Sequence, residues 1–228
     1  LGGQIRLACV PPHKEILGTA IDYFEMRLKQ EGVEVRLGVD ADAETVASLK
    51  PDTVIVAAGS LPYVPPIPGI EHAAKSWDIL DGAYAPPEGK RVVIIGGGSV
   101  GCDTALYLLT KRNKITIIEM LGQVAAGQEA SHRTRDLETM EKGGVNIQTL
   151  AAVQSVSDAG VAYTDKDGAS RFAEADLVVV STGQRPVGAD LALALEEKGI
   201  KVTRAGDAMA IGKILTNVRS GFLAGYDA

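Results

Sequence analysis

The stretch Arg91-Val-Val-Ile-Ile-Gly-Gly-Gly-Ser-Val-Gly101 decides the fold of this 228-residue chain. An apolar run ends in residues 96–101, which fit the pattern G-x-G-x-x-G, and a helical pattern then continues to about Lys111. A second apolar strand over residues 115–119 closes the unit. A glycine turn between a buried strand and a helix is typical of dinucleotide-binding α/β domains. We therefore expect a Rossmann-like fold with a parallel sheet covered on both faces.

Each glycine of this turn has its own expected task. Gly96 permits the tight bend, Gly98 lets a pyrophosphate approach the backbone, and Gly101 lets the helix lie against the strands. The first helical residues, Ser99 and Val100, offer N–H groups and a partial positive charge to the phosphates. The alternative is a glycine-rich turn with no ligand, but the surrounding strand, helix and second strand favour a nucleotide site.

Glu119 is the expected partner of the adenosine ribose. It ends the second strand 18 residues after Gly101, close to the spacing of about 20 residues seen for this acid. A carboxylate there accepts hydrogen bonds from ribose hydroxyls and repels a 2′-phosphate. No arginine or lysine occurs between Ile115 and Gln128 to neutralise that phosphate. The sequence therefore favours NADH over NADPH.

An internal repeat predicts a second nucleotide cleft. Residues 52–62 and 176–186 share one frame, with aspartate seven residues before a glycine and proline three residues after it. We expect both glycines, Gly59 and Gly183, to line nucleotide clefts. The alternative for each is a simple turn at a strand end. The later pair Gly206-Asp207 is by itself equally well explained by an Asx turn.

Composition excludes several classes of protein. The chain has 29 acidic and 23 basic residues, a net charge of −6, which argues against nucleic acid or an anionic membrane as partner. No apolar run reaches the ~18–20 residues of a membrane span. Cys9 and Cys102 form neither a disulfide framework, a zinc spacing nor a C-x-x-C pair, so we expect no metal site and a cytoplasmic location.

Hydrophobic periodicity outlines the remaining elements. Helices are expected over residues 13–31, 99–111, 129–142 and 189–198, and from about residue 212 to the end. Residues 61–69 hold four of the ten prolines and are expected to form an extended linker between domains. Strands are expected over residues 33–37, 53–58, 91–95, 115–119, 145–149, 151–157, 160–164, 171–172 and 177–180.

Three stretches carry a family resemblance: Leu1-Gly-Gly-Gln-Ile5, Pro11-Pro-His-Lys14 and Val92-Val-Ile-Ile-Gly-Gly-Gly-Ser-Val-Gly-Cys-Asp103. With the glycine motifs above, the chain resembles the pyridine-nucleotide-disulfide oxidoreductase superfamily. More narrowly, it resembles the C-terminal half of Old-Yellow-Enzyme-like NADH:flavin oxidoreductases of the 2,4-dienoyl-CoA reductase and trimethylamine dehydrogenase type. The resemblance implies an NAD(P)-binding domain, residues 89–185, inserted in an FAD-binding domain, residues 1–88 and 186–228.

The resemblance also implies roles for the candidate residues. Gly96, Gly98 and Gly101 would cradle the NAD pyrophosphate, Glu119 would hold its ribose, and Gly183 would face the nicotinamide half. On the flavin side, Gly59 would lie near FAD, and Asp207 with Gly206 would bind the ribityl-phosphate region.

The chain departs from the family pattern at its start. The first FAD-binding strand, glycine turn and acid expected upstream of Leu1 are not in the sequence, so we expect an incomplete FAD domain that retains FAD poorly. An N-terminal FMN barrel of the parent enzyme is expected as partner. Exposed strand edges predict association, including a homodimer.

The expected function is that of an enzyme part, the nucleotide-binding region of an NADH-dependent flavin oxidoreductase that is inactive in isolation. Hydride transfer from nicotinamide to flavin needs positioning of two rings and no protein acid or base, so no catalytic side chain is expected. The three histidines, His13, His72 and His132, are expected on the surface, and Cys102 in packing. The alternative is a module that binds ADP for structural purposes without hydride transfer.

Overall fold

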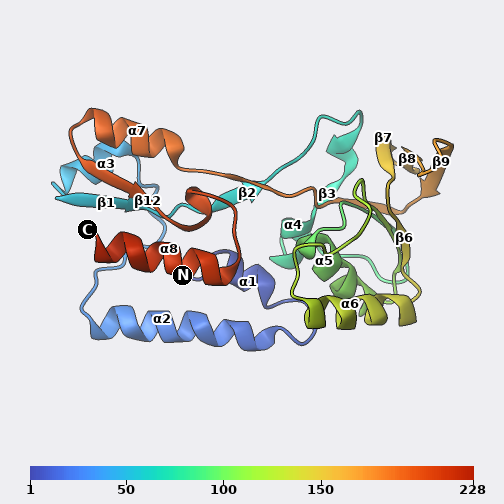
Figure 1. Cartoon of the computed structure of the whole chain (residues 1–228), viewed down its shortest axis with the longest axis horizontal. Helices are drawn as coiled ribbons and strands as arrows, with labels where there is room; N and C mark the ends of the chain where they lie inside the picture. Colours follow the sequence, from blue (N-terminus) through green and yellow to red (C-terminus); the bar gives the residue numbers. More distant parts are fainter. The chain divides into compact units, whose positions relative to one another are not determined.

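The computed structural model describes all 228 residues, which fold into two compact units (Figure 1). Unit 1 comprises residues 1–27 and 62–183, and unit 2 comprises residues 28–61 and 184–228. The chain therefore passes between the units after residues 27, 61 and 183.

A five-stranded parallel sheet forms the centre of unit 1, in the order β3-β10-β4-β5-β6. Strand β4 pairs with β10 on one side, where Val93 lies opposite Val178, and with β5 on the other, where Val93 lies opposite Thr116. Strand order reverses between β4 and β10, and such a switch point is where open α/β sheets bind ligands. The strands are β3 (Ala74–Lys75), β4 (Arg91–Ile95), β5 (Lys114–Ile118), β6 (Asn146–Gln148) and β10 (Leu177–Val180).

Both faces of this sheet are covered, which explains the unbroken apolar run of β4. Val92 and Ile94 pack into one hydrophobic cluster with residues of α5, and Val93 and Ile95 pack into a second cluster with residues of β7 and β8. Each of the four is at most 3% exposed. Because successive side chains of a strand point to opposite faces, a strand covered on both sides must be apolar throughout.

Helices cover the first face: α4 (Ser76–Leu80), α5 (Ser99–Leu109) and α6 (Ala130–Lys142). From α5, Cys102, Ala105 and Leu108 enter the cluster, each with 0% exposure. At the start of α6 the Glu129 carboxylate accepts from the hydroxyl and N–H of Ser131. These hydrogen bonds lower the pKa of Glu129 to about 2 and define where the helix begins.

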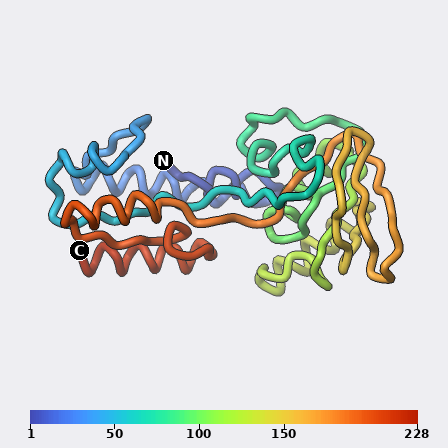
Figure 2. Tube along the Cα trace, turned by 90° about the horizontal axis from the view of Figure 1, so that it is seen from above, coloured from blue at the N-terminus to red at the C-terminus, as the bar shows by residue number.

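A three-stranded antiparallel sheet covers the second face, and Figure 2 shows its strands as a separate layer beside the helices and sheet. Its strands are β7 (Ala152–Ser157), β8 (Gly160–Thr164) and β9 (Ser170–Glu174). Residues 165–168 form the turn between β8 and β9, where the N–H of Gly168 donates to the Asp165 carbonyl at 3.0 Å. Val161 at the centre of this layer is fully buried.

Unit 2 contains a smaller parallel pair, β1 (Thr53–Val56) and β12 (Lys201–Arg204). Its helices are α3 (Ala43–Ser48), α7 (Ala189–Glu197) and α8 (Ile214–Tyr226), with a 3-10 turn at Gly206–Ala208. Few apolar side chains are buried here, and most are small: Val56, Ala192, Leu195, Ala205, Ala208 and Ala224. Large apolar side chains of α8 are exposed, including Leu215 (78%), Phe222 (68%) and Tyr226 (80%).

Before β1 the chain forms α1 (Gln4–Ala8), a 3-10 turn (Glu15–Gly18) and α2 (Thr19–Gln30). The helix expected over residues 13–31 is thus confirmed from residue 15 onward, although none of α2 is buried. The strand expected over residues 33–37 is wrong, because this segment pairs with no strand. Val33, Val35 and Leu37 are 50%, 43% and 69% exposed. Alternation favours a strand locally, but a strand also needs a neighbour to complete its hydrogen-bond ladder.

The internal repeat is visible in the backbone. The first copy forms β1, the second forms β10, and each strand is followed by a glycine with positive φ, Gly59 at 77° and Gly183 at 95°. Each glycine then leads into a short strand, β2 (Ser60–Pro62) or β11 (Gln184–Pro186), and these two strands pair with each other. Equivalent sequences therefore form equivalent elements.

None of the helices in the structure combines the length and the apolar character needed to cross a membrane.

Candidate nucleotide-binding site

The glycine turn lies between β4 and α5, beside the switch point of the sheet. Gly96 has a φ of 97°, which side chains other than glycine rarely adopt. A Cβ on Gly96 would lie 2.4 Å from the carbonyl oxygen of Ser181, on the segment that follows β10. The first glycine is therefore required both by its backbone angle and by the adjacent strand end.

Gly98 is glycine for a different reason. It is the N-cap of α5 with φ −66° and ψ −176°, angles open to any residue, and a Cβ here would meet nothing within 4 Å. Gly98 and Ser99 are exposed. The fold itself would therefore accept a side chain at position 98. A ligand that must contact the backbone there requires glycine.

The amino end of α5 has no capping side chain, in contrast to α6 with Glu129. The first N–H groups of a helix lack partners within the helix and carry partial positive charge. The amides of Ser99 and Val100 therefore lie uncapped directly behind the open space at Gly98. This arrangement fits a pyrophosphate.

Gly101 holds the helix close to the sheet. A Cβ on Gly101 would lie 2.1 Å from the carbonyl oxygen of Gly96 and 3.1 Å from its carbonyl carbon. No side chain can move aside to relieve a contact with backbone. Gly101 thus has the packing role expected for the third glycine of the motif.

Glu119 follows β5 directly and is 9% exposed. Its Oε2 accepts from the N–H of Gly97 at 2.6 Å, and its Oε1 accepts from the N–H of Leu121 at 2.7 Å. A carboxylate has about four acceptor positions, so two backbone donors orient the group and leave acceptor capacity for ribose hydroxyls. The acid is therefore tied to the middle of the glycine turn.

Gly183 lies at the same edge of the sheet, because β10 runs parallel to β4. Its carbonyl accepts from the N–H of Tyr63 at 2.9 Å, and the Thr182 hydroxyl donates to the Tyr63 carbonyl at 2.7 Å. A Cβ on Gly183 would meet nothing within 4 Å. Unit 1 thus brings seven of the ten candidate residues together at the carboxyl ends of its strands: Gly96, Gly98, Ser99, Val100, Gly101, Glu119 and Gly183.

The other three candidates, Gly59, Gly206 and Asp207, lie in unit 2 after the parallel strands β1 and β12. The Asp207 side chain is 7% exposed, and its Oδ1 accepts from the N–H of Gly212 at 2.9 Å and from Asn217 Nδ2 at 2.6 Å. The Ser60 hydroxyl donates to its Oδ2 at 3.2 Å. Asp207 therefore ties the loop before α8 to the residue after Gly59.

The sequence did not indicate Gly97, Val124 or Arg133 as part of this site. A Cβ on Gly97 would lie 2.4 Å from Val124 Cγ1, and the Gly97 carbonyl accepts from the N–H of Ala125 at 2.7 Å. Arg133 Nε donates to the Val124 carbonyl at 3.1 Å. The loop after Glu119 thus contacts the glycine turn and is hydrogen-bonded to an arginine of α6. The sequence could not indicate these contacts, because they are made by backbone groups and by an arginine far from the motif in the sequence.

Cys102 follows the glycine turn directly, and its Sγ donates to the Gly97 carbonyl at 3.4 Å. Cys102 is fully buried, and burial raises the pKa of its thiol to about 12, so it is a packed and unreactive side chain. His13, His72 and His132 are exposed, and His72 Nδ1 lies 2.8 Å from an Asp158 carboxylate oxygen.

Comparisons with known proteins agree with this geometry. The chain is 43% identical over 226 residues to "NADH oxidase" of Thermoanaerobacter brockii, covering 97% of this chain and 35% of that protein. It is 36% identical to "Bilirubin reductase" of Mediterraneibacter gnavus, covering 91% of this chain and 32% of that protein. The structure of a 2-naphthoyl-CoA reductase complex superposes with a TM-score of 0.93 at 25% identity, covering 100% of this chain and 34% of that one. The chain thus spans about a third of the length of these relatives.

The family match extends over nearly the whole chain. Residues 7–225 match the family described as pyridine nucleotide-disulphide oxidoreductase, and the solved structure of high TM-score has the same arrangement of elements. The family predicted from the sequence is confirmed: this chain belongs to the pyridine nucleotide-disulphide oxidoreductases.

Proposed function

We propose that this chain is the nucleotide-binding region of an NADH-dependent flavin oxidoreductase. The observation that carries the proposal is the open space at Gly98 in front of the uncapped end of α5. Glu119, hydrogen-bonded to Gly97 in the same turn, supplies the sugar-binding group beside it. A relative 43% identical, named NADH oxidase, supports the same cofactor.

The residues of unit 1 would act by binding and orientation. The amides of Ser99 and Val100 would donate to the pyrophosphate, and Glu119 would accept from the ribose hydroxyls. Gly183, beside β4 at the switch point, would leave room for the nicotinamide half. When bound, the cofactors supply the chemistry, a hydride given by the nicotinamide and taken up by the flavin.

We propose residues 89–185 as the NAD(P)-binding domain and residues 1–88 and 186–228 as the part that serves FAD. Gly59, Gly206 and Asp207 would lie near the flavin nucleotide. We expect the chain alone to retain FAD weakly and to be inactive, because the sheet of unit 2 has only two strands and much of its apolar surface is open. An FMN barrel of the intact enzyme is the proposed further partner, and a second copy of the chain could cover the open strand edges.

One observation favours the rival function, a structural ADP-binding module. The Asp207 carboxylate accepts hydrogen bonds from Ser60, Gly212 and Asn217. These contacts organise the loop before α8, so Asp207 has a structural role that does not require a flavin. Calorimetric titration with NADH and with ADP distinguishes the two. Markedly tighter binding of NADH supports the oxidoreductase, and equal binding of the two supports the module.

The nucleotide preference gives a sharper test. We expect Glu119→Gln to lower the ratio of NADH to NADPH affinity by about tenfold or more, because a charged hydrogen bond is worth roughly 1.5–3 kcal/mol. Glutamine keeps the size of the side chain and one acceptor for the amides of Gly97 and Leu121. Fluorescence titration with each nucleotide measures the ratio.

Glu141→Gln, which removes an exposed carboxylate of α6, is the matched control and should leave the ratio unchanged. Should Glu119→Gln also leave it unchanged, Glu119 does not contact the ribose. The double variant Glu119→Gln with Arg133→Ala then tests whether the guanidinium of Arg133, which extends from α6 to the Val124 carbonyl, contributes to NADPH binding.

A further inference from the structure

Two peptide groups link Arg133 of α6 to the amide of Gly98. Arg133 Nε donates to the Val124 carbonyl at 3.1 Å. That carbonyl shares a peptide group with the N–H of Ala125, which donates to the Gly97 carbonyl at 2.7 Å. The Gly97 carbonyl in turn shares a peptide group with the N–H of Gly98. These contacts form a relay that runs from the guanidinium through the 124–125 peptide and the 97–98 peptide.

The trans geometry of the peptide bond gives this relay a direction. The structure has no cis peptide bonds, and in a planar trans peptide the N–H points away from the carbonyl. Since the Gly97 carbonyl faces Ala125, the N–H of Gly98 points to the opposite side. No protein group accepts a hydrogen bond from this N–H, and a Cβ on Gly98 would meet nothing within 4 Å. The last donor of the relay is therefore available to a ligand.

Ala125 adopts an unfavourable backbone conformation where it makes its contact. Its φ is 53°, in the left-handed region, although the residue is fully buried. The Gly97 carbonyl also accepts from Cys102 Sγ at 3.4 Å, and the Gly97 N–H donates to Glu119 at 2.6 Å. Strain that several contacts hold in place is typical of functional sites. The loop after Glu119 thus fixes the orientation of the 97–98 peptide.

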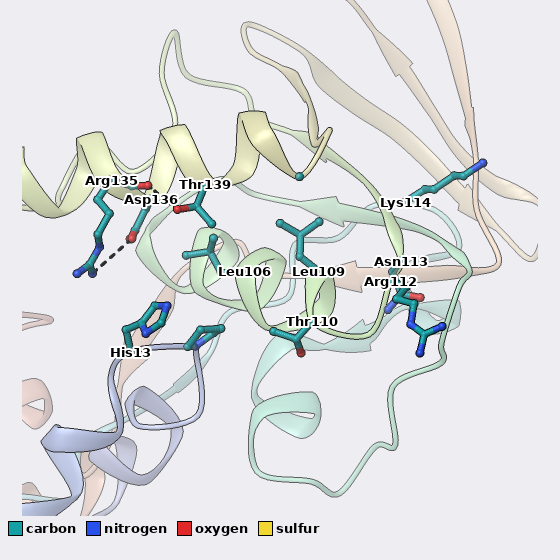
Figure 3. Close-up of a pocket in the computed structure, with 12 residues that line it drawn as sticks. His13, Leu106, Leu109, Thr110, Arg112, Asn113, Lys114, Arg135, Asp136 and Thr139 are labelled. Atoms are coloured by element: carbon teal, nitrogen blue, oxygen red, sulfur yellow. Dashed lines mark hydrogen bonds and ion pairs between the residues drawn. The ribbon is translucent and has the colours of Figure 1, made fainter.

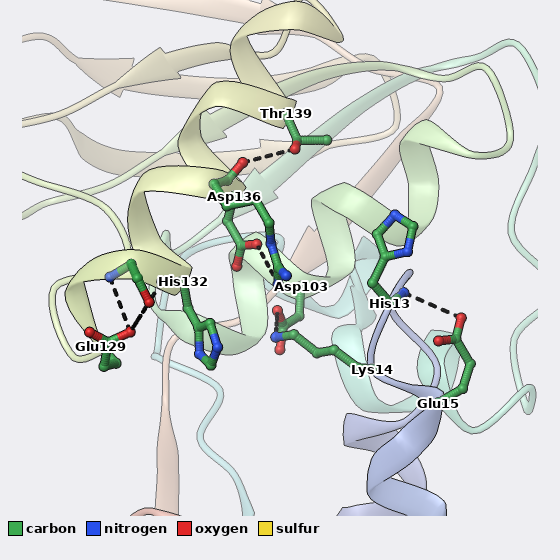
Figure 4. A network of polar contacts seen from close by, with 10 residues as sticks. His13, Lys14, Glu15, Asp103, Glu129, His132, Asp136 and Thr139 are labelled. Atoms are coloured by element: carbon green, nitrogen blue, oxygen red, sulfur yellow. Dashed lines mark hydrogen bonds and ion pairs between the residues drawn. The ribbon is translucent and has the colours of Figure 1, made fainter.

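Arg133 brings an unneutralised positive charge to the relay. It lies one turn after Glu129, whose carboxylate caps the start of α6 through Ser131 (Figure 4). The side chain of Arg133 is half-buried and forms no ion pair. A cation bonded to a carbonyl polarises the whole peptide group, and hydrogen bonds in such a chain strengthen one another. The charge therefore acts beyond the first carbonyl.

We propose that Arg133 strengthens pyrophosphate binding through this relay, without contacting the nucleotide. The inference rests on the proposed function, because it takes the pyrophosphate to lie at Gly98. The guanidinium makes the Ala125 N–H a stronger donor, and the Gly97 carbonyl passes this polarisation on to the Gly98 N–H. Arg133 is thus a positioning residue, which orients and polarises the amide that meets the negative charge.

The amide resonance of Gly98 in the nucleotide-free protein tests the relay directly. We expect Arg133→Met, which removes the charge and the donor, to shift the Gly98 amide proton upfield, because its peptide group becomes less polarised. Arg133→Lys, which keeps a cation and a donor, should restore most of the original shift. An unmoved Gly98 resonance in Arg133→Met would overturn the relay. This measurement needs no bound nucleotide, so it stays informative if the proposed function fails.

Calorimetric titration with NADH and with ADP, which share the pyrophosphate, measures the effect on binding. We expect Arg133→Met to weaken both by about threefold to tenfold. Unchanged affinities would overturn the proposal. Weaker binding together with an unmoved Gly98 resonance would also overturn it, since Arg133 would then contact the nucleotide directly. Failure of the unmodified protein to bind either nucleotide would instead count against the proposed function.

Arg135→Met is the matched control, since it removes the same charge from the same helix. The Arg135 side chain is exposed and lines a cavity of about 670 Å³ between α5 and α6 (Figure 3), to which no residue of the relay contributes. We expect this variant to leave the Gly98 resonance and both affinities unchanged. Equal losses in Arg133→Met and Arg135→Met would overturn the relay in favour of a general effect of net charge.

Discussion

Gly98→Ala is expected to leave the thermal midpoint near that of the unmodified protein and to weaken NADH binding about tenfold to a hundredfold. The backbone angles of Gly98 suit alanine, and the new Cβ meets no protein atom within 4 Å. The methyl group occupies the space that a pyrophosphate needs, and forced contacts of this kind cost roughly 1–3 kcal/mol. Circular dichroism and calorimetric titration measure the two quantities.

Gly127→Ala is the matched control. A Cβ on Gly127 also meets nothing within 4 Å, but this glycine lies outside the turn, so both stability and NADH affinity should stay unchanged. If Gly98→Ala bound NADH as well as Gly127→Ala does, no ligand would touch the backbone at Gly98.

Gly101→Ala is expected to act on stability. Its Cβ would lie 2.1 Å from the Gly96 carbonyl oxygen, so α5 must move away from β4. Such overpacking costs about 1–3 kcal/mol, and each kcal/mol lowers the midpoint by about 2–4 °C in a chain of this size. NADH binding should weaken as well, because the helix end moves with the helix. Thermal unfolding followed by circular dichroism measures the effect.

Gly225→Ala provides the contrast, since this glycine lies within α8 and a Cβ there meets nothing within 4 Å. Alanine in an open helical position raises helix stability by about 0.5–1 kcal/mol. A midpoint of Gly101→Ala within about 1 °C of the unmodified protein would contradict the close packing of α5 on β4.

How far the sequence predicted the structure differs between the units. In unit 1, β4, β8 and β10 have the predicted boundaries, because each combines an apolar pattern with local turn residues. In unit 2, the alternation of residues 33–37 predicted a strand that has no neighbour to pair with. The sequence did not predict strand β12, Lys201–Arg204, because two residues between charged ones show no clear apolar pattern. The segment is a strand because it pairs with β1.

The site shows the same division between local and distant information. The spacing of the motif, together with the strands and helix around it, indicated Gly98 and Glu119, since each motif position has a fixed task. The hydrogen bond from the Gly97 amide to Glu119 was not predictable, because every residue has such an amide.

The most direct test of a nucleotide held at the glycine turn is an NMR titration of the isotope-labelled protein with NADH. We expect the amide resonances of Gly98, Ser99 and Val100 to shift most, saturating together with that of Glu119. Binding that leaves these four amides unmoved, or no binding at all, would contradict the account.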